Sequence, residues 1–71
     1  MRVPAKDRSK TLVDYIRYHI NEYGYPPTYR EMAIELGVRS TSTVKLVVDS
    51  LVDQDILDMA PGKARTLRFR K

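Results

Sequence analysis

Only four residues, from Gly37 to Ser40, separate two segments whose apolar residues have helical spacing. After this turn, Val44, Val48 and Leu51 recur at i, i+4 and i+7, which places them on one face of a helix. Ser40 precedes that helix, where its hydroxyl can accept a hydrogen bond from an amide two or three residues further on. Two short helices joined by a tight turn that starts with glycine are typical of a helix-turn-helix unit.

The segment before the turn, residues 28–37, carries its own start and stop signals. Thr28 and Glu31 have the spacing of a capping box, in which each side chain satisfies an amide of the first turn. Gly37 can adopt the left-handed conformation that ends many helices. Three residues are predicted to form the buried stripe: Met32, Ala33 and Leu36. Ile34 points away from this stripe, so we expect it to be exposed.

A longer helix is predicted for residues 8–23. Its apolar stripe consists of Leu12, Ile16, Ile20 and Tyr23. Gly24 ends this helix, and the following Pro26-Pro27 pair prevents its continuation. His19 lies at the edge of the stripe, where a single histidine is expected to be packed and hydrogen-bonded rather than to bind a metal or act as a base.

The C-terminal residues change to the pattern of a β-hairpin. Residues 56–60 and 66–70 read as two strands, with the reversal at Pro61-Gly62. Leu67 and Phe69 alternate with polar residues, so one face of the second strand is expected to pack inward and the other to be basic. The fold class predicted is mainly helical α+β: a winged helix-turn-helix, in which a three-helix bundle precedes a two-stranded β-hairpin wing.

The composition is compatible with one such domain over residues 1–71. The core must hold by packing alone, because the chain has no cysteine for disulfides or a thiolate zinc site. With 42% hydrophobic residues this is feasible even near the lower size limit for a single core. No apolar run is as long as a membrane span, which favours a soluble cytoplasmic protein.

The sequence gives little support for catalysis. It has no nucleophile-elbow or phosphate-loop pattern. Four acids lie at the end of the third helix and in the strand predicted after it: Asp49, Asp53, Asp55 and Asp58. They lack the glycine and glutamate spacing of a calcium loop. We therefore predict no enzyme activity, no cofactor and no metal site.

Positive charge is concentrated at the two ends of the chain, whose net charge is +4. Residues 1–10 contain four basic residues and one acid, and residues 61–71 contain five basic residues and no acid. Residues 11–60 contain four basic residues and eight acids. This layout suggests a phosphate-bearing partner that touches both ends, although two solvated tails would give the same pattern.

These features coincide with a family resemblance. GYPPTYREMAIELGVRSTSTVKLVVDSLVDQDIL, followed by the basic hairpin PGKARTLRF, resembles the N-terminal DNA-binding domain of the LexA repressor family from about Lys6 to Phe69. Its most specific positions are Pro26, Pro27, Thr28, Glu31, Ala33, Leu36, Gly37, Ser40 and Thr43. The resemblance implies a winged helix-turn-helix that places its third helix in the major groove.

The chain departs from the family pattern in two ways. LexA proteins continue into a second domain that dimerises and cleaves itself, and none of that is present here. Either this is a DNA-binding fragment of a self-cleaving repressor, or it is a small regulator without self-cleavage. The best-known members also carry Asn and two Glu where this chain has Ser42, Lys45 and Leu46. A different operator is therefore expected.

The start of the third helix is predicted to read bases through Ser42, Thr43, Lys45 and Leu46. Lys45 suits the acceptors of guanine and Leu46 suits a thymine methyl, whereas the hydroxyls are adaptable. Phosphate contacts are predicted from eight residues: Thr28, Tyr29, Arg30, Arg39, Ser40, Thr41, Lys63 and Arg65. The alternative is that the hydroxyls only cap the helix and that these charges are solvated.

The function predicted is sequence-specific binding of double-stranded DNA by a transcriptional repressor that blocks a promoter. Two copies on a palindromic operator, as a homodimer on DNA, would supply the affinity that one small domain lacks. The rival hypothesis is a protein-interaction module that binds another regulator through the exposed Ile34 and Leu46. It gains support from Asp49 and Asp53, which are poorly suited to lie against DNA.

Overall fold

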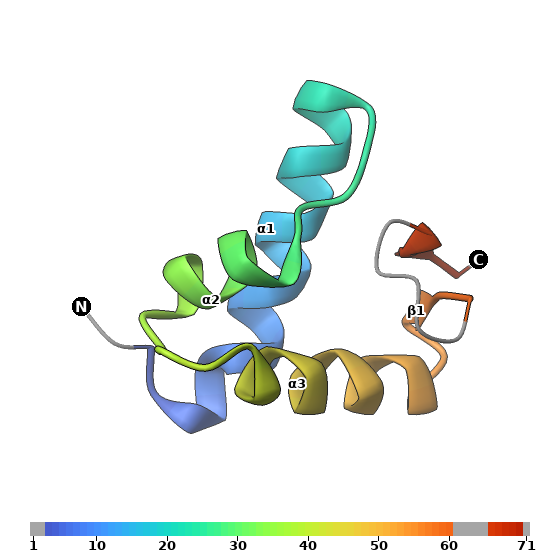
Figure 1. Cartoon of the computed structure of the whole chain (residues 1–71). Coiled ribbons are helices and arrows are strands. Elements are labelled where there is room, and N and C mark those ends of the chain that lie inside the picture. The colour runs from blue at the N-terminus through green and yellow to red at the C-terminus, as the bar shows by residue number, and fades with distance from the viewer. Residues whose placement is uncertain (1–2, 61–65, 71) are drawn as a thin grey trace.

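The computed structural model describes residues 3–60 and 66–70, which form three helices and a short hairpin (Figure 1). A 3-10 turn, η1 (Ala5–Asp7), leads into α1 (Arg8–Tyr23), and α2 (Tyr29–Leu36) and α3 (Thr41–Asp53) follow. Strands β1 (Leu57–Asp58) and β2 (Arg68–Phe69) pair in an antiparallel ladder. The predicted winged helix-turn-helix class is confirmed, and so are all three predicted helices. The 3-10 turn was not predicted.

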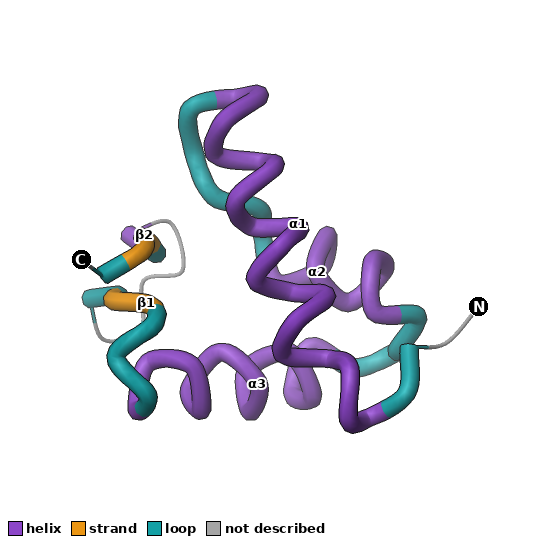
Figure 2. Tube along the Cα trace, turned by 180° about the vertical axis from the view of Figure 1, so that it is seen from behind, coloured by secondary structure: helices purple, strands orange, loops and turns teal. Residues whose placement is uncertain are grey.

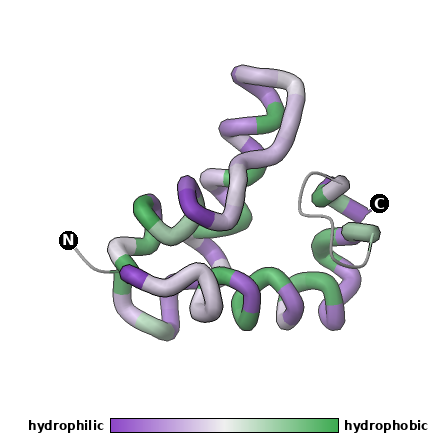
Figure 3. The backbone as a smooth tube through the Cα atoms, in the orientation of Figure 1, coloured by the Kyte–Doolittle hydropathy of each residue, from purple (hydrophilic) through white to green (hydrophobic). Residues whose placement is uncertain are grey.

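One apolar core joins the helices to the hairpin. It consists of Leu12, Ile16, Met32, Ala33, Leu36, Val44, Val48, Leu51, Leu57 and Leu67. Every helix contributes one face, so polar and apolar positions alternate around the helices (Figure 3). The predicted stripes of the second and third helices are confirmed.

The prediction for Tyr23 is wrong, because its side chain is 56% exposed instead of lying in the core stripe. The end of α1 projects beyond the packed helices, so the stripe has nothing to pack against there (Figures 1 and 2). The Tyr23 ring packs on His19 instead, with ring centroids 4.6 Å apart.

The turn between α2 and α3 closes as its sequence predicts. Gly37 takes the left-handed conformation at φ 70°, and the Val38 amide donates to the Ala33 carbonyl at 3.0 Å. The same arrangement ends α3, where Asp55 is left-handed at φ 62° and the Ile56 amide donates to the Leu51 carbonyl at 3.0 Å. Asp tolerates this conformation better than most residues do, which explains how α3 ends without a glycine.

The hairpin is shorter than the predicted strands over 56–60 and 66–70. Its register pairs Leu57 with Phe69 and Asp58 with Arg68. The ladder stops there because the Ala60 amide donates to the Thr66 hydroxyl, at 2.7 Å, and not to a backbone carbonyl. The inward face is as predicted, since Leu67 is buried and Phe69 is half-buried. The predicted reversal at Pro61-Gly62 lies outside the described residues. None of the helices described here has the length and apolar content needed to cross a membrane.

Candidate nucleic-acid interface

The N-terminus of α3 is built by Ser40. Its backbone is extended, and its side-chain oxygen accepts a hydrogen bond from the Ser42 amide at 3.1 Å. This confirms Ser40 as the N-cap and leaves Thr41, which is exposed, as the first helical residue. Because the first amides of a helix carry partial positive charge, this end of α3 favours a nearby anion such as a phosphate.

The four predicted base readers follow the cap on α3. Ser42, Lys45 and Leu46 are exposed, and Leu46 keeps 71% of its surface accessible. Thr43 is half-buried beside Val44, which is fully buried. Ser42, Lys45 and Leu46 are therefore the accessible side chains among the four, with Thr43 at their margin.

The N-terminus of α2 carries the predicted capping box. The Glu31 amide donates to the Thr28 hydroxyl oxygen at 3.1 Å, and the Thr28 amide donates to the Glu31 carboxylate at 2.8 Å. The hydrogen bond from the Thr28 backbone lowers the pKa of Glu31 below its ordinary value. The Thr28 amide is thus already used, while the Thr28 side chain and Arg30 are exposed at this helix end.

Tyr29 has a position that its sequence context did not predict. It is half-buried, and its hydroxyl donates to the Met59 sulfur at 3.5 Å, next to the hairpin. Burial, and then the carboxylate of Asp49 on α3, raise the pKa of this phenol. Tyr29 thus links α2 to the residue that follows β1 in the hairpin. Residues 29 and 59 are too far apart in the sequence for local signals to show this contact.

The basic residues of the helix-turn-helix segment differ from those of the hairpin in their ion pairs. Within the described parts of the chain, Arg30, Arg39 and Lys45 form no hydrogen bond or ion pair with another residue, and all three are exposed. By contrast, Arg68 pairs with Asp58 at 3.3 Å and Arg70 pairs with Asp55 at 3.5 Å. These three cations all belong to the helix-turn-helix segment; among the described residues, Lys6, Arg8 and Arg17 nearer the N-terminus also form no ion pair. The two predicted phosphate contacts at the wing tip, Lys63 and Arg65, lie outside the described residues.

The single histidine is packed and hydrogen-bonded, as predicted. Only 5% of the His19 surface is accessible, and its Nδ1 donates to the Tyr25 carbonyl at 2.7 Å. Its Nε2 lies 3.9 Å from the Glu31 carboxylate, so His19 lies next to the first turn of α2. Across residues 3–60 and 66–70, no three potential metal ligands come together.

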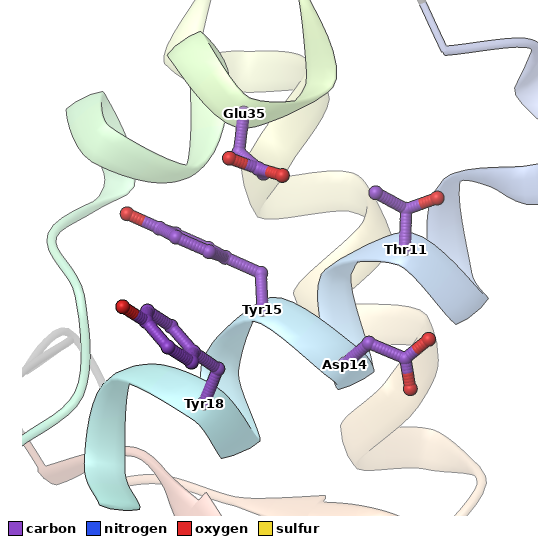
Figure 4. A pocket seen from close by; sticks show the side chains of 5 residues that line it. All are labelled: Thr11, Asp14, Tyr15, Tyr18 and Glu35. Carbon is purple, nitrogen blue, oxygen red and sulfur yellow. The ribbon is translucent and has the colours of Figure 1, made fainter. Parts of the chain in front are cut away.

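Sequence reasoning missed a hollow of about 390 Å³ between α1 and α2 (Figure 4). It is lined by Thr11, Asp14, Tyr15, Tyr18 and Glu35. The α1 residues among these recur at i, i+3, i+4 and i+7, which would have indicated a shared helical face. That Glu35 of α2 faces them depends on how the two helices pack.

Known proteins resemble the chain over most of its length. A family model described as the LexA DNA binding domain matches residues 4–66. The LexA repressor of Limosilactobacillus reuteri (strain DSM 20016) is 38% identical over 65 residues, which cover 92% of this chain and 31% of the relative. That of Marinobacter nauticus is 38% identical over 62 residues, covering 87% of this chain and 31% of the relative. For Vibrio cholerae serotype O1 (strain M66-2) the identity is 35% over 66 residues, covering 93% and 32%.

The chain thus spans about a third of the length of these relatives. Within that third, the match includes the whole helix-turn-helix segment and its two capped helix starts. On these grounds the chain belongs to the LexA DNA-binding domain family.

Proposed function

We propose that this chain is the DNA-reading unit of a transcriptional repressor that inserts the start of α3 into the major groove of an operator. The observation that carries the proposal is the group of exposed cations without an ion pair in the helix-turn-helix segment. Arg30, Arg39 and Lys45 are unpaired and exposed in the helix-turn-helix segment, whereas Arg68 and Arg70 are held by acids. Unpaired cations can neutralise phosphates without first breaking an ion pair, and each one adds to the salt dependence of binding.

Base reading is assigned to Ser42, Thr43, Lys45 and Leu46. Lys45 donates to guanine O6 and N7, and Leu46 contacts a thymine methyl, while the two hydroxyls adapt to either a donor or an acceptor. Phosphate contacts are assigned to the two helix starts and the wing: Thr28, Tyr29, Arg30, Arg39, Ser40, Thr41, Lys63 and Arg65. For Tyr29, such a contact competes with the hydrogen bond to Met59.

Repression would follow from occupancy of a promoter by two copies on a palindromic operator, in the cytoplasm where the bacterial chromosome lies. One copy makes few base contacts, so two copies are needed for useful affinity. Because both copies must face the same side of the duplex, the two half-sites should be separated by about one helical turn or a multiple of it. A longer self-cleaving repressor and a free-standing regulator would use the same DNA contacts, so the proposal is the same for both.

The test is selection from a randomised pool of DNA duplexes at low and moderate salt, with wild type and Lys45→Ala. We expect one motif to be enriched by the wild type and its affinity to fall about 5- to 150-fold in Lys45→Ala, as for the loss of a good base contact. Lys10→Ala is the matched control, because it removes one positive charge from α1, outside the assigned contacts. Equal losses in both variants, or no enriched motif, would contradict base reading by Lys45.

A second candidate function is supported by two exposed apolar residues. Ile34 is 75% exposed on α2 and Leu46 is 71% exposed on α3, and both could contact another regulator. Ile34→Ser separates the two functions, because Ile34 is not among the assigned DNA contacts. DNA selection unchanged in Ile34→Ser but lost in Lys45→Ala supports DNA reading, whereas no DNA selection by the wild type, together with binding to a regulator that Ile34→Ser abolishes, supports a protein partner.

A further inference from the structure

The largest group of exposed aromatic residues lies away from the recognition helix. Tyr18, Tyr23 and Tyr25 are 54%, 56% and 60% exposed, and all belong to the second half of α1 or the loop that follows it. Both backbone views show this end of α1 projecting on the side opposite to α3 (Figures 1 and 2). A duplex held by α3 would therefore leave these rings accessible.

The hollow between α1 and α2 lies beside this aromatic group. Its walls are the rings of Tyr15 and Tyr18 on one side and the carboxylate of Glu35 on the other (Figure 4). Asp14 and Thr11 line the end nearer the start of α1. A hollow of about 390 Å³ that opens to solvent can receive one long side chain.

The electrostatic character of the hollow is negative, although the whole chain has a net charge of +4. Burial, followed by the carboxylates of Glu31 and Glu35, raises the pKa of the Tyr15 phenol. The neighbouring Tyr23 phenol and the Glu22 carboxylate raise the pKa of Tyr18. Both phenols therefore stay neutral at physiological pH, and the surrounding charges disfavour DNA and favour a cation.

Lys10 is the one described cation that already pairs with a residue of the hollow, at 3.2 Å from Asp14. Its side chain is 83% exposed, and an exposed pair of this kind is weak and easily exchanged. Glu35 forms no ion pair with any described residue. The hollow thus offers one unpaired carboxylate opposite two aromatic rings.

We propose that this hollow docks an arginine side chain from a basic segment of a protein partner, independently of DNA reading by α3. The guanidinium plane stacks against a tyrosine ring while its N–H groups donate to the Glu35 carboxylate. Arginine fits better than lysine, because a planar guanidinium can stack on a ring and bind a carboxylate through two parallel hydrogen bonds. The exposed tyrosines beside the hollow supply the contact surface for the residues that flank the arginine, as tyrosines commonly do at protein interfaces.

The probe is the peptide acetyl-Gly-Ser-Arg-Gly-Ser-Arg-Gly-amide, whose capped ends leave the arginines as its only charges. It is titrated into ¹⁵N-labelled protein and followed by two-dimensional NMR. The control peptide carries citrulline, which has the same shape as arginine but no charge. We expect the arginine peptide to shift the amides of residues 11–22 and 31–35 in fast exchange, with saturation near millimolar concentrations. The shifts should be the same with and without a saturating operator duplex, and citrulline should abolish them.

Two variants test the assigned contacts. Tyr18→Ala and Glu35→Gln should each weaken peptide binding at least fivefold, and both positions are exposed, so the fold should be retained. Asp53→Asn is the matched control, because it makes the same change in net charge at the far end of α3 and should leave peptide binding unchanged. Neither Tyr18 nor Glu35 is assigned to DNA, so the selection experiment with Lys45→Ala can fail or succeed separately.

Four results would overturn the proposal. Equal binding of the citrulline peptide would show that the charge of the arginine is not recognised. Chemical shifts centred on Asp49 and Asp53 would show that the peptide binds α3 and not the hollow. Unchanged binding in Glu35→Gln would remove the carboxylate. Self-association in sedimentation, weakened by Glu35→Gln without any peptide, would make a second copy of this chain the occupant in place of a protein partner.

Discussion

The three-helix body and the hairpin are held in place by different kinds of contact. The body buries eight apolar side chains from α1, α2 and α3, and capping side chains and left-handed residues fix the ends of α2 and α3. The hairpin has two residues in each strand and contributes only Leu57 and Leu67 to the core. Ile56, Met59 and Phe69 pack half-buried against that core, and the other described attachments of the hairpin are side-chain contacts at the surface.

Four such contacts join the hairpin to the rest of the chain or tie it together. The Arg17 guanidinium lies over the Phe69 ring, 4.4 Å from its centroid, and the Tyr29 hydroxyl donates to Met59. The two others are the exposed ion pairs Asp58–Arg68 and Asp55–Arg70. Contacts of this kind contribute about 1 kcal/mol or less each, whereas a buried leucine contributes several times as much. The body should therefore be the rigid part and the hairpin the part that is easier to displace.

The largest expected effect is a core truncation in the body. Leu36 is completely buried between the helices, so Leu36→Ala should lower the free energy of unfolding by about 2–5 kcal/mol. Leu67→Ala removes the same atoms from the hairpin, where the neighbours can collapse more easily, and should cost less. Urea denaturation followed by circular dichroism measures both. A loss for Leu67→Ala as large as that for Leu36→Ala would show that the hairpin is as firmly packed as the body.

The second effect concerns the capping box of α2. Thr28→Ala removes the acceptor for the Glu31 amide and should lower the free energy of unfolding by about 0.5–2 kcal/mol.

The capping box also predicts that the stability of the fold depends on pH. Because the Thr28 amide lowers the pKa of Glu31 in the folded chain, the carboxylate stabilises the fold above its ordinary pKa of 4.5, and this stabilisation is lost as the pH falls through the lowered value.

Glu31→Gln provides the matched control for this pH dependence. Its amide oxygen can still accept from the Thr28 backbone but does not titrate. Thermal melts from about pH 7 to about pH 3 should show a smaller loss of stability on acidification in Glu31→Gln than in the wild type. Identical pH profiles for the two proteins would mean that other carboxylates dominate acid unfolding.

Helix positions in the body were predictable because their signals act within a few residues. Thr28, Gly37 and Ser40 each satisfy or redirect the backbone next to them, and all three do in the structure what their spacing predicts. The fold class followed from these helices and from the alternation of Leu67 and Phe69. By contrast, the exposure of Tyr23 depends on where the neighbouring helices end, which no local pattern records.

The joints of the hairpin were not predictable for the same physical reason. Tyr29 and Met59 come together across the fold, as do Arg17 and Phe69, and neither pair has a periodic relationship in the sequence. The left-handed Asp55 was also missed, because aspartate at a helix end is a weaker signal than glycine. For the candidate interface, the exposure of Ser42, Lys45 and Leu46 on α3 followed from the phase of its apolar residues. The ion pairs of Arg68 and Arg70 with Asp58 and Asp55 could not be predicted from local sequence, because the hairpin brings these residues together.

A smaller effect is expected from the joint between α1 and the hairpin. Arg17→Met keeps the aliphatic stem but removes the charge over Phe69, and should cost about 0.5–1 kcal/mol of stability. Phe69→Leu should show the same coupling, so the double variant should lose less than the two single losses together. Arg17→Lys should restore part of the loss. Full additivity in urea denaturation would mean that Arg17 and Phe69 do not act on each other.

The smallest effect on stability separates the two groups of cations. Arg70→Gln breaks only an exposed ion pair and should change the free energy of unfolding by about 0.2–0.5 kcal/mol. In DNA binding, Arg39→Gln should reduce the slope of log K against log salt by about 0.9, because an unpaired cation that meets a phosphate releases one counterion. Arg70→Gln should leave the slope nearly unchanged, since Asp55 already neutralises this arginine.

Fluorescence anisotropy titrations across a salt series measure these slopes with the operator from the selection experiment. A slope for Arg70→Gln that falls as far as that for Arg39→Gln would mean that DNA displaces Asp55 and takes its place. In that event Asp55→Asn should strengthen binding, because Arg70 would no longer have to leave an acid before meeting a phosphate. The hairpin would then supply further cations that bind phosphate once they leave their carboxylate partners. The distinction between body and hairpin would hold for stability but not for DNA binding.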